Sequence, residues 1–222
     1  MKLLAIDTSA HICSVCILDV EADDILASEM RDIGRGHAEV LMELINACLD
    51  TSNITYQDLS RIGVTIGPGS FTGVRVGMSV ARGFGLSLKI PVLGISTLDA
   101  CEAKANQSDY DGKLVTLLDA KRSELYCKIS GEAPFAASYA EIAKNISIIN
   151  PSLCGSGAAI LNEHCQLEYP VIHDDEACEI EIIAKLASKL SDSEASPEPL
   201  YLRSADAKVQ AGFALERMEV PS

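Results

Sequence analysis

The 222-residue sequence contains no tryptophan, and aromatic residues make up only 5% of it. Proteins that hold single-stranded nucleic acid usually stack its bases on aromatic rings. With so few rings, we exclude a base-stacking platform. Hydrophobic residues (48%) and charged residues (23%) occur at ordinary globular levels. A chain of this length buries enough surface to fold without disulfide bonds.

The sequence is also poor in positive charge. Residues 1–100 carry 7 basic and 12 acidic side chains, and residues 101–222 carry 11 and 20; the balances of −5 and −9 sum to the net charge of −14. Affinity for a phosphate backbone comes from clustered lysine and arginine. Neither half is basic, so we expect the chain to act on nucleic acid only with a partner that supplies the positive surface.

Long apolar runs and paired metal-ligand motifs are missing as well. No apolar stretch approaches the ~20 residues of a membrane-spanning helix, and no signal peptide follows Lys2. The one CxxC, at Cys13 and Cys16, falls in a predicted strand, where positions i and i+3 face opposite sides and cannot share a metal. We expect buried, reduced thiols in a cytoplasmic protein without membrane contact.

Short apolar strands and amphipathic helices alternate along the chain. The patterns predict strands at 2–7, 12–18, 24–30, 61–67, 90–96, 113–120 and 124–130, and helices at 36–50, 72–88, 97–105, 138–144 and 177–190. The stretch "SIINPSLCGSGAAIL" predicts a further strand, a glycine turn and the start of a helix. "LLAIDTS…ICSVCIL" and "VTLLDAK…ELYCKIS" share the order of strand, aspartate, turn and returning strand. We therefore predict two related lobes, residues 1–103 and a smaller 104–203, with 204–222 a loosely attached tail.

This organisation predicts an α/β protein with the duplicated, two-lobed fold of actin, sugar kinases and Hsp70, which is ribonuclease H-like. Nucleotides bind between the lobes of such folds. Glycine permits close backbone approach, a helix N-terminus offers N–H groups to an anion, and an aspartate at a strand end holds Mg²⁺ through water. The candidate nucleotide-binding residues are Asp7, Thr8, Ser9, Gly67, Gly69, Ser70, Asp119, Gly155 and Gly157.

Ordinary structural roles compete with this interpretation. Asp7 could cap a turn, the two glycines at 155 and 157 could form a simple turn, and Ser70 could be a helix N-cap. We therefore expect no resident cofactor and at most weak nucleotide binding between the lobes, as a vestige.

Four stretches together carry a resemblance to a known family: "IDTS", "GPGSFTGVRVG", "LLDAKRSELY" and "PLYLR". Residues 1–203 closely resemble the bacterial TsaB (YeaZ) family of tRNA threonylcarbamoyladenosine biosynthesis, and "GPGSFTGVRVG" is the most specific match. The resemblance implies a non-catalytic scaffold that activates the TsaD paralogue. The resemblance further implies that the chain works with the ATPase TsaE and TsaC-type enzymes, reaches tRNA only through that complex and forms a homodimer when alone.

The TsaD relatives hold a metal with two histidines four residues apart, and alignment places those positions on Thr97 and Cys101. The four histidines (11, 37, 164 and 173) offer no pair at helical spacing. We therefore expect no metal site and no catalytic residues. The alternative is an ATP-dependent small-molecule kinase of the same fold class, but no catalytic base is evident; a metalloprotease is opposed by the missing histidines.

Small residues recur every four positions on the helix at 72–88, although an interior glycine costs about 1 kcal/mol relative to alanine. The stripe consists of Gly73, Gly77, Ala81 and Gly85. It either packs on this chain's own sheet or receives a helix of another chain, and the family resemblance favours the second. The other half of the expected interface is His37, Leu41 and Ile45, with packing or capping the alternative for His37.

Overall fold

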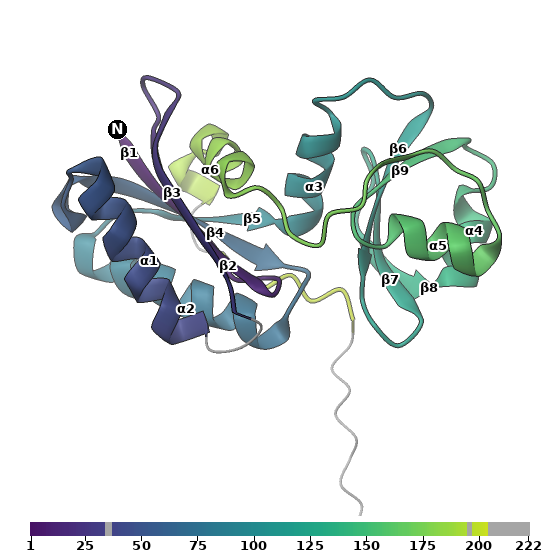
Figure 1. The fold of residues 1–222 in the computed structure, drawn as a ribbon, viewed down its shortest axis with the longest axis horizontal. Helices are drawn as coiled ribbons and strands as arrows, with labels where there is room; N and C mark the ends of the chain where they lie inside the picture. The colour runs from purple at the N-terminus through teal and green to yellow at the C-terminus, as the bar shows by residue number, and fades with distance from the viewer. Residues whose placement is uncertain (34–36, 195–196, 204–222) are drawn as a thin grey trace, which may run out of the picture.

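The computed structural model describes residues 1–33, 37–194 and 197–203. Two lobes each contain a five-stranded sheet (Figure 1). The first sheet comprises β1 (Lys2–Asp7), β2 (Ile12–Asp19), β3 (Asp24–Asp32), β4 (Leu59–Gly67) and β5 (Val92–Ser96). The second comprises β6 (Lys113–Asp119), β7 (Glu124–Ile129), β8 (Phe135–Ser138), β9 (Pro151–Cys154) and β10 (Val171–His173). The tail predicted at 204–222 lies outside the described residues.

The two sheets have the same topology. The first runs β3-β2-β1-β4-β5, and the second, read from its other edge, runs β8-β7-β6-β9-β10. In each, the first three strands along the chain are antiparallel, the fourth pairs with the first in parallel, and the fifth pairs with the fourth in parallel. This repeat confirms the predicted duplicated fold class. Neither β8 nor β10 had been predicted, because both are short and only partly buried.

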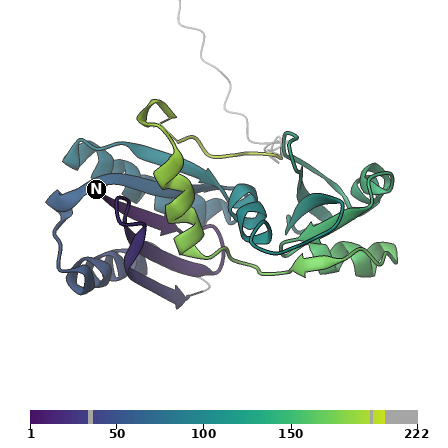
Figure 2. The ribbon, with the colours of Figure 1, turned by 90° about the horizontal axis from the view of Figure 1, so that it is seen from above.

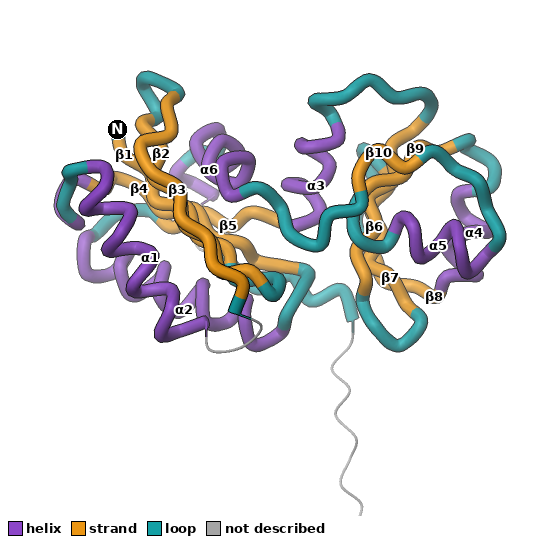
Figure 3. Tube along the Cα trace, in the orientation of Figure 1, coloured by secondary structure: helices purple, strands orange, loops and turns teal. Residues whose placement is uncertain are grey.

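Six α-helices cover the sheets within the described residues. They are α1 (His37–Ser52), α2 (Phe71–Leu88), α3 (Thr97–Ala105), α4 (Tyr139–Ile146), α5 (Ala158–Cys165) and α6 (Ile180–Lys189). Helices α1 and α2 cover one face of the first sheet and α6 crosses the other (Figures 1 and 2). Helix α3 lies between the lobes (Figure 3) and contacts β5 on one side and β6 on the other.

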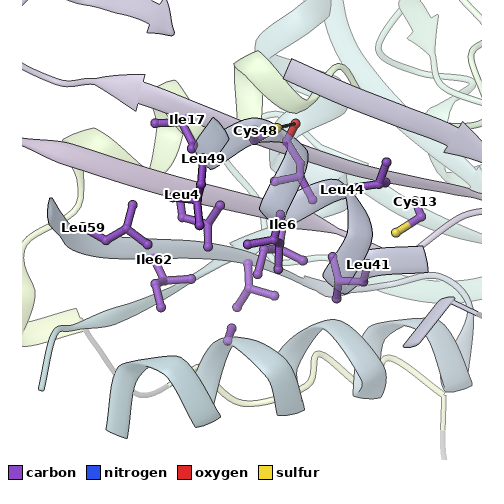
Figure 4. Close-up of a cluster of buried hydrophobic side chains, with 14 of the residues drawn as sticks. Leu4, Ile6, Cys13, Ile17, Leu41, Leu44, Cys48, Leu49, Leu59 and Ile62 are labelled. Atoms are coloured by element: carbon purple, nitrogen blue, oxygen red, sulfur yellow. Dashed lines mark hydrogen bonds between the residues drawn. The ribbon is translucent and has the colours of Figure 1, made fainter. Parts of the chain in front are cut away.

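The core of the first lobe follows from the alternation of β2. Cys13 and Ile17 face α1 and α2, in the cluster that Figure 4 shows, whereas Cys16 packs in the cluster under α6. The two thiols of the CxxC therefore lie on opposite faces of the sheet, as predicted. Burial raises the pKa of the Cys13 thiol to about 11 and that of Cys16 to about 12, so both stay protonated at neutral pH.

The predicted lobe boundary is wrong for helix α6, which belongs to the first lobe. Residues 104–203 were assigned to the second lobe, but α6 packs against β1, β2 and β4 of the first. Its apolar stripe, including Ile180, Ile183 and Ala187, needs an apolar surface, and the uncovered face of the first sheet provides one. The chain thus leaves the first lobe after α3, builds the second, and returns. No helix in the described part of the chain is long and apolar enough to span a membrane.

Candidate functional site between the lobes and on helix α2

A cavity of about 380 Å³ opens between the lobes. Its wall comes from the turn after β1, the glycine loop after β4, α3, the turn after β6, β7, the turn after β9 with α5, and the connector between β10 and α6. Four of the nine predicted nucleotide residues line it: Ser9, Gly69, Ser70 and Asp119. The other five are not part of its lining: Asp7, Thr8, Gly67, Gly155 and Gly157.

The carboxylate of Asp7 is buried, with 1% of the residue exposed. One of its oxygens, Oδ1, accepts a hydrogen bond from the Ser9 amide at 2.8 Å and another from the Thr65 hydroxyl at 2.7 Å. These bonds fix the turn after β1 and tie it to β4. Asp7 was predicted either to bind a nucleotide or to cap a turn. In the structure its carboxylate caps the turn and does not line the cavity.

The glycine loop packs directly on that turn. The Ser70 amide donates to the Ser9 carbonyl at 2.6 Å, and the Thr8 hydroxyl donates to the Gly73 carbonyl at 2.7 Å. A Cβ on Gly69 would overlap the Ser9 backbone, so this glycine is required for close approach of two parts of the same chain. Ser70 is the N-cap of α2, and its hydroxyl accepts from the Gly73 amide at 3.2 Å.

Asp119 is the predicted counterpart of Asp7 in the second lobe. Its side chain accepts from the Lys121 amide at 2.7 Å and pairs with the Lys121 ammonium at 2.6 Å. The hydrogen bond to Asp119 raises the pKa of Lys121, which therefore carries its charge throughout the neutral range. The ammonium neutralises the one carboxylate that this turn offers to the cavity.

The turn after β9 is also occupied by contacts within the chain. The Gly155 amide donates to the His173 carbonyl at 2.8 Å, and the Gly157 amide donates to the Leu117 carbonyl at 2.9 Å. Gly155 has a φ of +90°, and a Cβ there would overlap Leu117. These glycines let the turn pack on β6, and their amides are not directed at a ligand.

Helix α3 begins where alignment with metal-binding relatives placed two ligands. The Thr97 hydroxyl donates to the Pro68 carbonyl at 2.5 Å, and Cys101 is 2% exposed and packs with Leu98 and Leu118. Among the described residues, no group of three or more His, Cys, Asp or Glu side chains is placed to hold a metal ion.

The small-residue stripe of α2 faces this chain's own sheet, which corrects its assignment to a partner interface. A Cβ on Gly73 would overlap the Thr8 carbonyl oxygen, one on Gly77 would overlap the Thr8 hydroxyl, and one on Gly85 would overlap Val92. Ala81 is fully buried in the same core. The physical reason is that α2 lies very close to β1 and β5, where any larger side chain would force them apart.

The residues proposed for α1 need the same correction. Leu41 and Ile45 are fully buried against the first sheet (Leu41 is labelled in Figure 4), so they cannot touch another chain. His37 is the first residue of α1, and its side chain lies outside the described part.

The opposite face of α2 is the exposed one. Phe71 is 59% exposed and Leu86 is 84% exposed, and a groove between α1 and α2 adjoins Phe71. The groove is lined by Ala38, Phe71, Thr72, Arg75, Val76, Ser79 and Val80. Gly83 lies further along this side, exposed, with no atom within 4 Å of where its Cβ would be. We call residues 71, 72, 75, 76, 79, 80, 83 and 86 the outer face of α2.

An arginine between two aromatic rings marks the start of the outer face. The Arg75 guanidinium lies 3.6 Å from the centre of the Phe71 ring and donates two hydrogen bonds, of 3.1 and 3.0 Å, to the Tyr201 hydroxyl. Tyrosine and arginine are the residues that most often dominate binding at protein interfaces. Arg75 and Tyr201 both lie in stretches that carry the family resemblance, but neither was predicted to have a role. The signal that could have indicated one is an arginine among the apolar and small residues of a helix.

Residues 197–203 form a strap that crosses from one lobe to the other (Figure 2). On the first lobe, the Leu200 amide donates to the Ile66 carbonyl at 2.8 Å, and Arg82 of α2 donates to the Pro197 carbonyl. On the second lobe, Arg203 donates to the Ala120 carbonyl at 3.1 Å and pairs with Glu124. The "PLYLR" stretch therefore connects the outer face of α2 to the turn after β6.

Comparison with known protein families gives a match over most of the chain. Residues 30–210 match the model of the TsaD family, described as tRNA N6-adenosine threonylcarbamoyltransferase. A Bacillus subtilis protein named tRNA threonylcarbamoyladenosine biosynthesis protein TsaB is 34% identical over 126 residues, which cover 57% of this chain and 53% of that protein. The match thus spans about half the length of that relative.

Two further similarities cover more of the chain. An uncharacterised Mycobacterium tuberculosis protein is 33% identical over 212 residues, 93% of each chain. The solved structure of YeaZ from Pseudomonas aeruginosa superposes with a TM-score of 0.74 and 24% identity, covering 90% of this chain and 99% of that one. The structural similarity agrees with the two-lobed fold.

Proposed function

This chain belongs to the TsaD family, in its TsaB/YeaZ branch, and on that premise we propose that it is a non-catalytic subunit of cytoplasmic tRNA threonylcarbamoyladenosine biosynthesis. Its role is to bind and activate a TsaD-like paralogue, which carries the catalytic site. A TsaE-like ATPase and a TsaC-type enzyme complete the system, and tRNA contacts this chain only within the complex.

The outer face of α2 is the observation that carries this proposal. It combines exposed apolar side chains, an arginine–aromatic cluster and a groove toward α1, which together suit a facing helix pair. Residues on this face recur at alternating intervals of four and three positions, a spacing that is typical of the contact line between two packed helices. They are Thr72, Val76, Ser79, Gly83 and Leu86. A TsaD-like partner covers this face in the complex, and a second copy covers it when the chain is alone.

The state of the cavity supports a non-catalytic role. The groups expected to hold a nucleotide are largely engaged within the chain: Asp7 by Ser9 and Thr65, and Asp119 by Lys121. Thr97 and Cys101 occupy the two helix positions where the relatives place metal ligands, and the Thr97 hydroxyl is bonded to the glycine loop. The chain has retained the fold of a nucleotide-binding protein and uses its turns for packing.

The alternative function, an ATP-dependent small-molecule kinase, rests on the same cavity, since Ser9, Gly69 and Ser70 line it. Calorimetric titration with ATP·Mg²⁺ and an assay of ATP turnover by the purified chain distinguish the two. We expect weak or no binding and no turnover. Repeated ATP turnover that phosphorylates one small-molecule acceptor for each ATP consumed would favour the kinase.

Two exposed aliphatic residues provide a matched test of the docking face. Leu86 on α2 is 84% exposed, and Ile148 on the second lobe is 87% exposed. Replacement of either by aspartate removes similar apolar area without disturbing the core. We expect Leu86→Asp to weaken capture of the TsaD-like partner by at least about tenfold, or 1.4 kcal/mol, and to reduce self-association in light scattering. Ile148→Asp should bind like the parent; equal binding by both variants would contradict the proposed face.

A further inference from the structure

Two cysteines that are 77 positions apart in the sequence, Cys101 and Cys178, meet in the wall of the inter-lobe cavity. Cys101 lies on α3, and Cys178 lies in the connector between β10 and α6. The Cys178 thiol donates to the Thr97 carbonyl at 3.5 Å, which places it against the first turn of α3. Cys178 also packs against the small buried cluster that contains Cys101.

The two thiols differ in access to solvent. Cys101 is 2% exposed, whereas Cys178 is partly exposed and borders the cavity. A small oxidant that enters the cavity therefore reaches the more exposed Cys178 first, and Cys101 lies in the wall of the same cavity. Cys165 is the other partly exposed cysteine, and it packs in the separate core of the second lobe.

We propose that Cys101 and Cys178 are a modification site, a dithiol that a peroxide converts reversibly into a disulfide. Cys178 sulfur attacks one peroxide oxygen: an S–O bond forms, the O–O bond breaks, and water leaves with the thiol proton. Cys101 sulfur then attacks the sulfenic acid sulfur of Cys178, the S–S bond forms and the S–O bond breaks, releasing a second water. Two thiols are oxidised by one hydrogen peroxide, and a dithiol reductant restores them.

The place of this pair gives the disulfide a structural consequence. The chain leaves the first lobe through α3 and returns through the connector that carries Cys178, so the bond would join both crossings. It would hold the cavity wall in one arrangement and close a long covalent loop around the second lobe. The neighbouring Cys101 thiol, together with burial, raises the pKa of Cys178, so oxidation is expected to be slow at neutral pH.

The test counts thiols and maps the bond in the whole protein. Hydrogen peroxide is added to the native chain, and free thiols are then alkylated under denaturing conditions. With eight cysteines in the sequence, the number of free thiols should fall from eight to six and return to eight with dithiothreitol. Digestion after Lys, Arg and Glu should yield Ile90–Glu102 joined to Ala177–Glu179, lighter by two hydrogens than the two separate peptides.

Serine variants identify the pair and provide the control. Cys165→Ser should still lose two thiols on oxidation, whereas Cys178→Ser should lose none to an intramolecular bond. Oxidation should raise the melting temperature of the parent and of Cys165→Ser, and leave that of Cys178→Ser unchanged. Since the mapping uses the parent protein, a folding defect in a variant does not obscure it. Oxidation of Cys178 to sulfinic acid without the joined peptides, or bonding to a different cysteine, would overturn the proposal.

Discussion

Two glycines six residues apart on α2, Gly77 and Gly83, should respond in opposite ways to the same change. Gly83 points outward, and no atom lies within 4 Å of its missing Cβ, whereas a Cβ on Gly77 would overlap the Thr8 hydroxyl. Alanine at either position gains about 1 kcal/mol of helix propensity. Only at Gly77 is that gain opposed by a collision in the core.

The magnitude at Gly77 follows from what Thr8 can do. The side chain of Thr8 is fully buried, and its hydroxyl is held by the Gly73 carbonyl at 2.7 Å. Making room means breaking that buried hydrogen bond or shifting α2 off the sheet, and either costs about 1–3 kcal/mol. We expect Gly83→Ala to stabilise the protein by about 1 kcal/mol and Gly77→Ala to destabilise it by up to about 2 kcal/mol after the propensity gain.

Urea unfolding followed by far-UV circular dichroism, at concentrations where the chain is monomeric, measures both values. The Gly83→Ala gain corresponds to a rise of about 2–4 °C in melting temperature for a chain of this size. Thr8→Ala added to Gly77→Ala removes the colliding oxygen, so the double variant should be more stable than the sum of the single changes predicts. Equal stabilisation by alanine at both glycines would refute the buried orientation that we assign to the stripe.

Three further expectations follow from the structure. Arg203→Ala removes the link between the strap and the turn after β6, so hydrogen exchange at residues 120–124 should become faster, while the exposed control Lys144→Ala should not change it. The hydrogen bond from Lys104 lowers the pKa of Asp175 below its ordinary value. The stability that this interaction adds is present above about pH 4 and is lost as pH falls through the lower folded pKa. The free energy of unfolding of Asp175→Asn should therefore depend less on pH, between about pH 4 and pH 2, than that of the parent protein. Gel shifts at moderate salt should show only weak tRNA binding by the chain alone, because a net charge of −14 opposes approach to a polyanion; sub-micromolar affinity without a partner would contradict this.

The sequence by itself determined most of the elements, their order and the duplication; the exceptions are the short, partly buried strands β8 and β10. Apolar alternation in β1 and β2 and the helical spacing in α1 are local patterns, and each side chain needs burial wherever the element finally packs. The repeated order of strand, aspartate, turn and returning strand was therefore enough to predict two related lobes. The missing pair of helix-spaced histidines could likewise be read directly from the sequence.

Only the tertiary structure decided which face of each element meets which neighbour. The stripe of Gly73, Gly77 and Gly85 indicates that another segment packs closely against α2. A strand of the same chain and a helix of another chain would both require this pattern, so the pattern does not distinguish them. The close packing of Thr8 and Val92 against these glycines settled that question. The return of α6 to the first sheet, the strap and the meeting of Cys101 with Cys178 likewise depend on contacts between distant segments, which no local periodicity encodes.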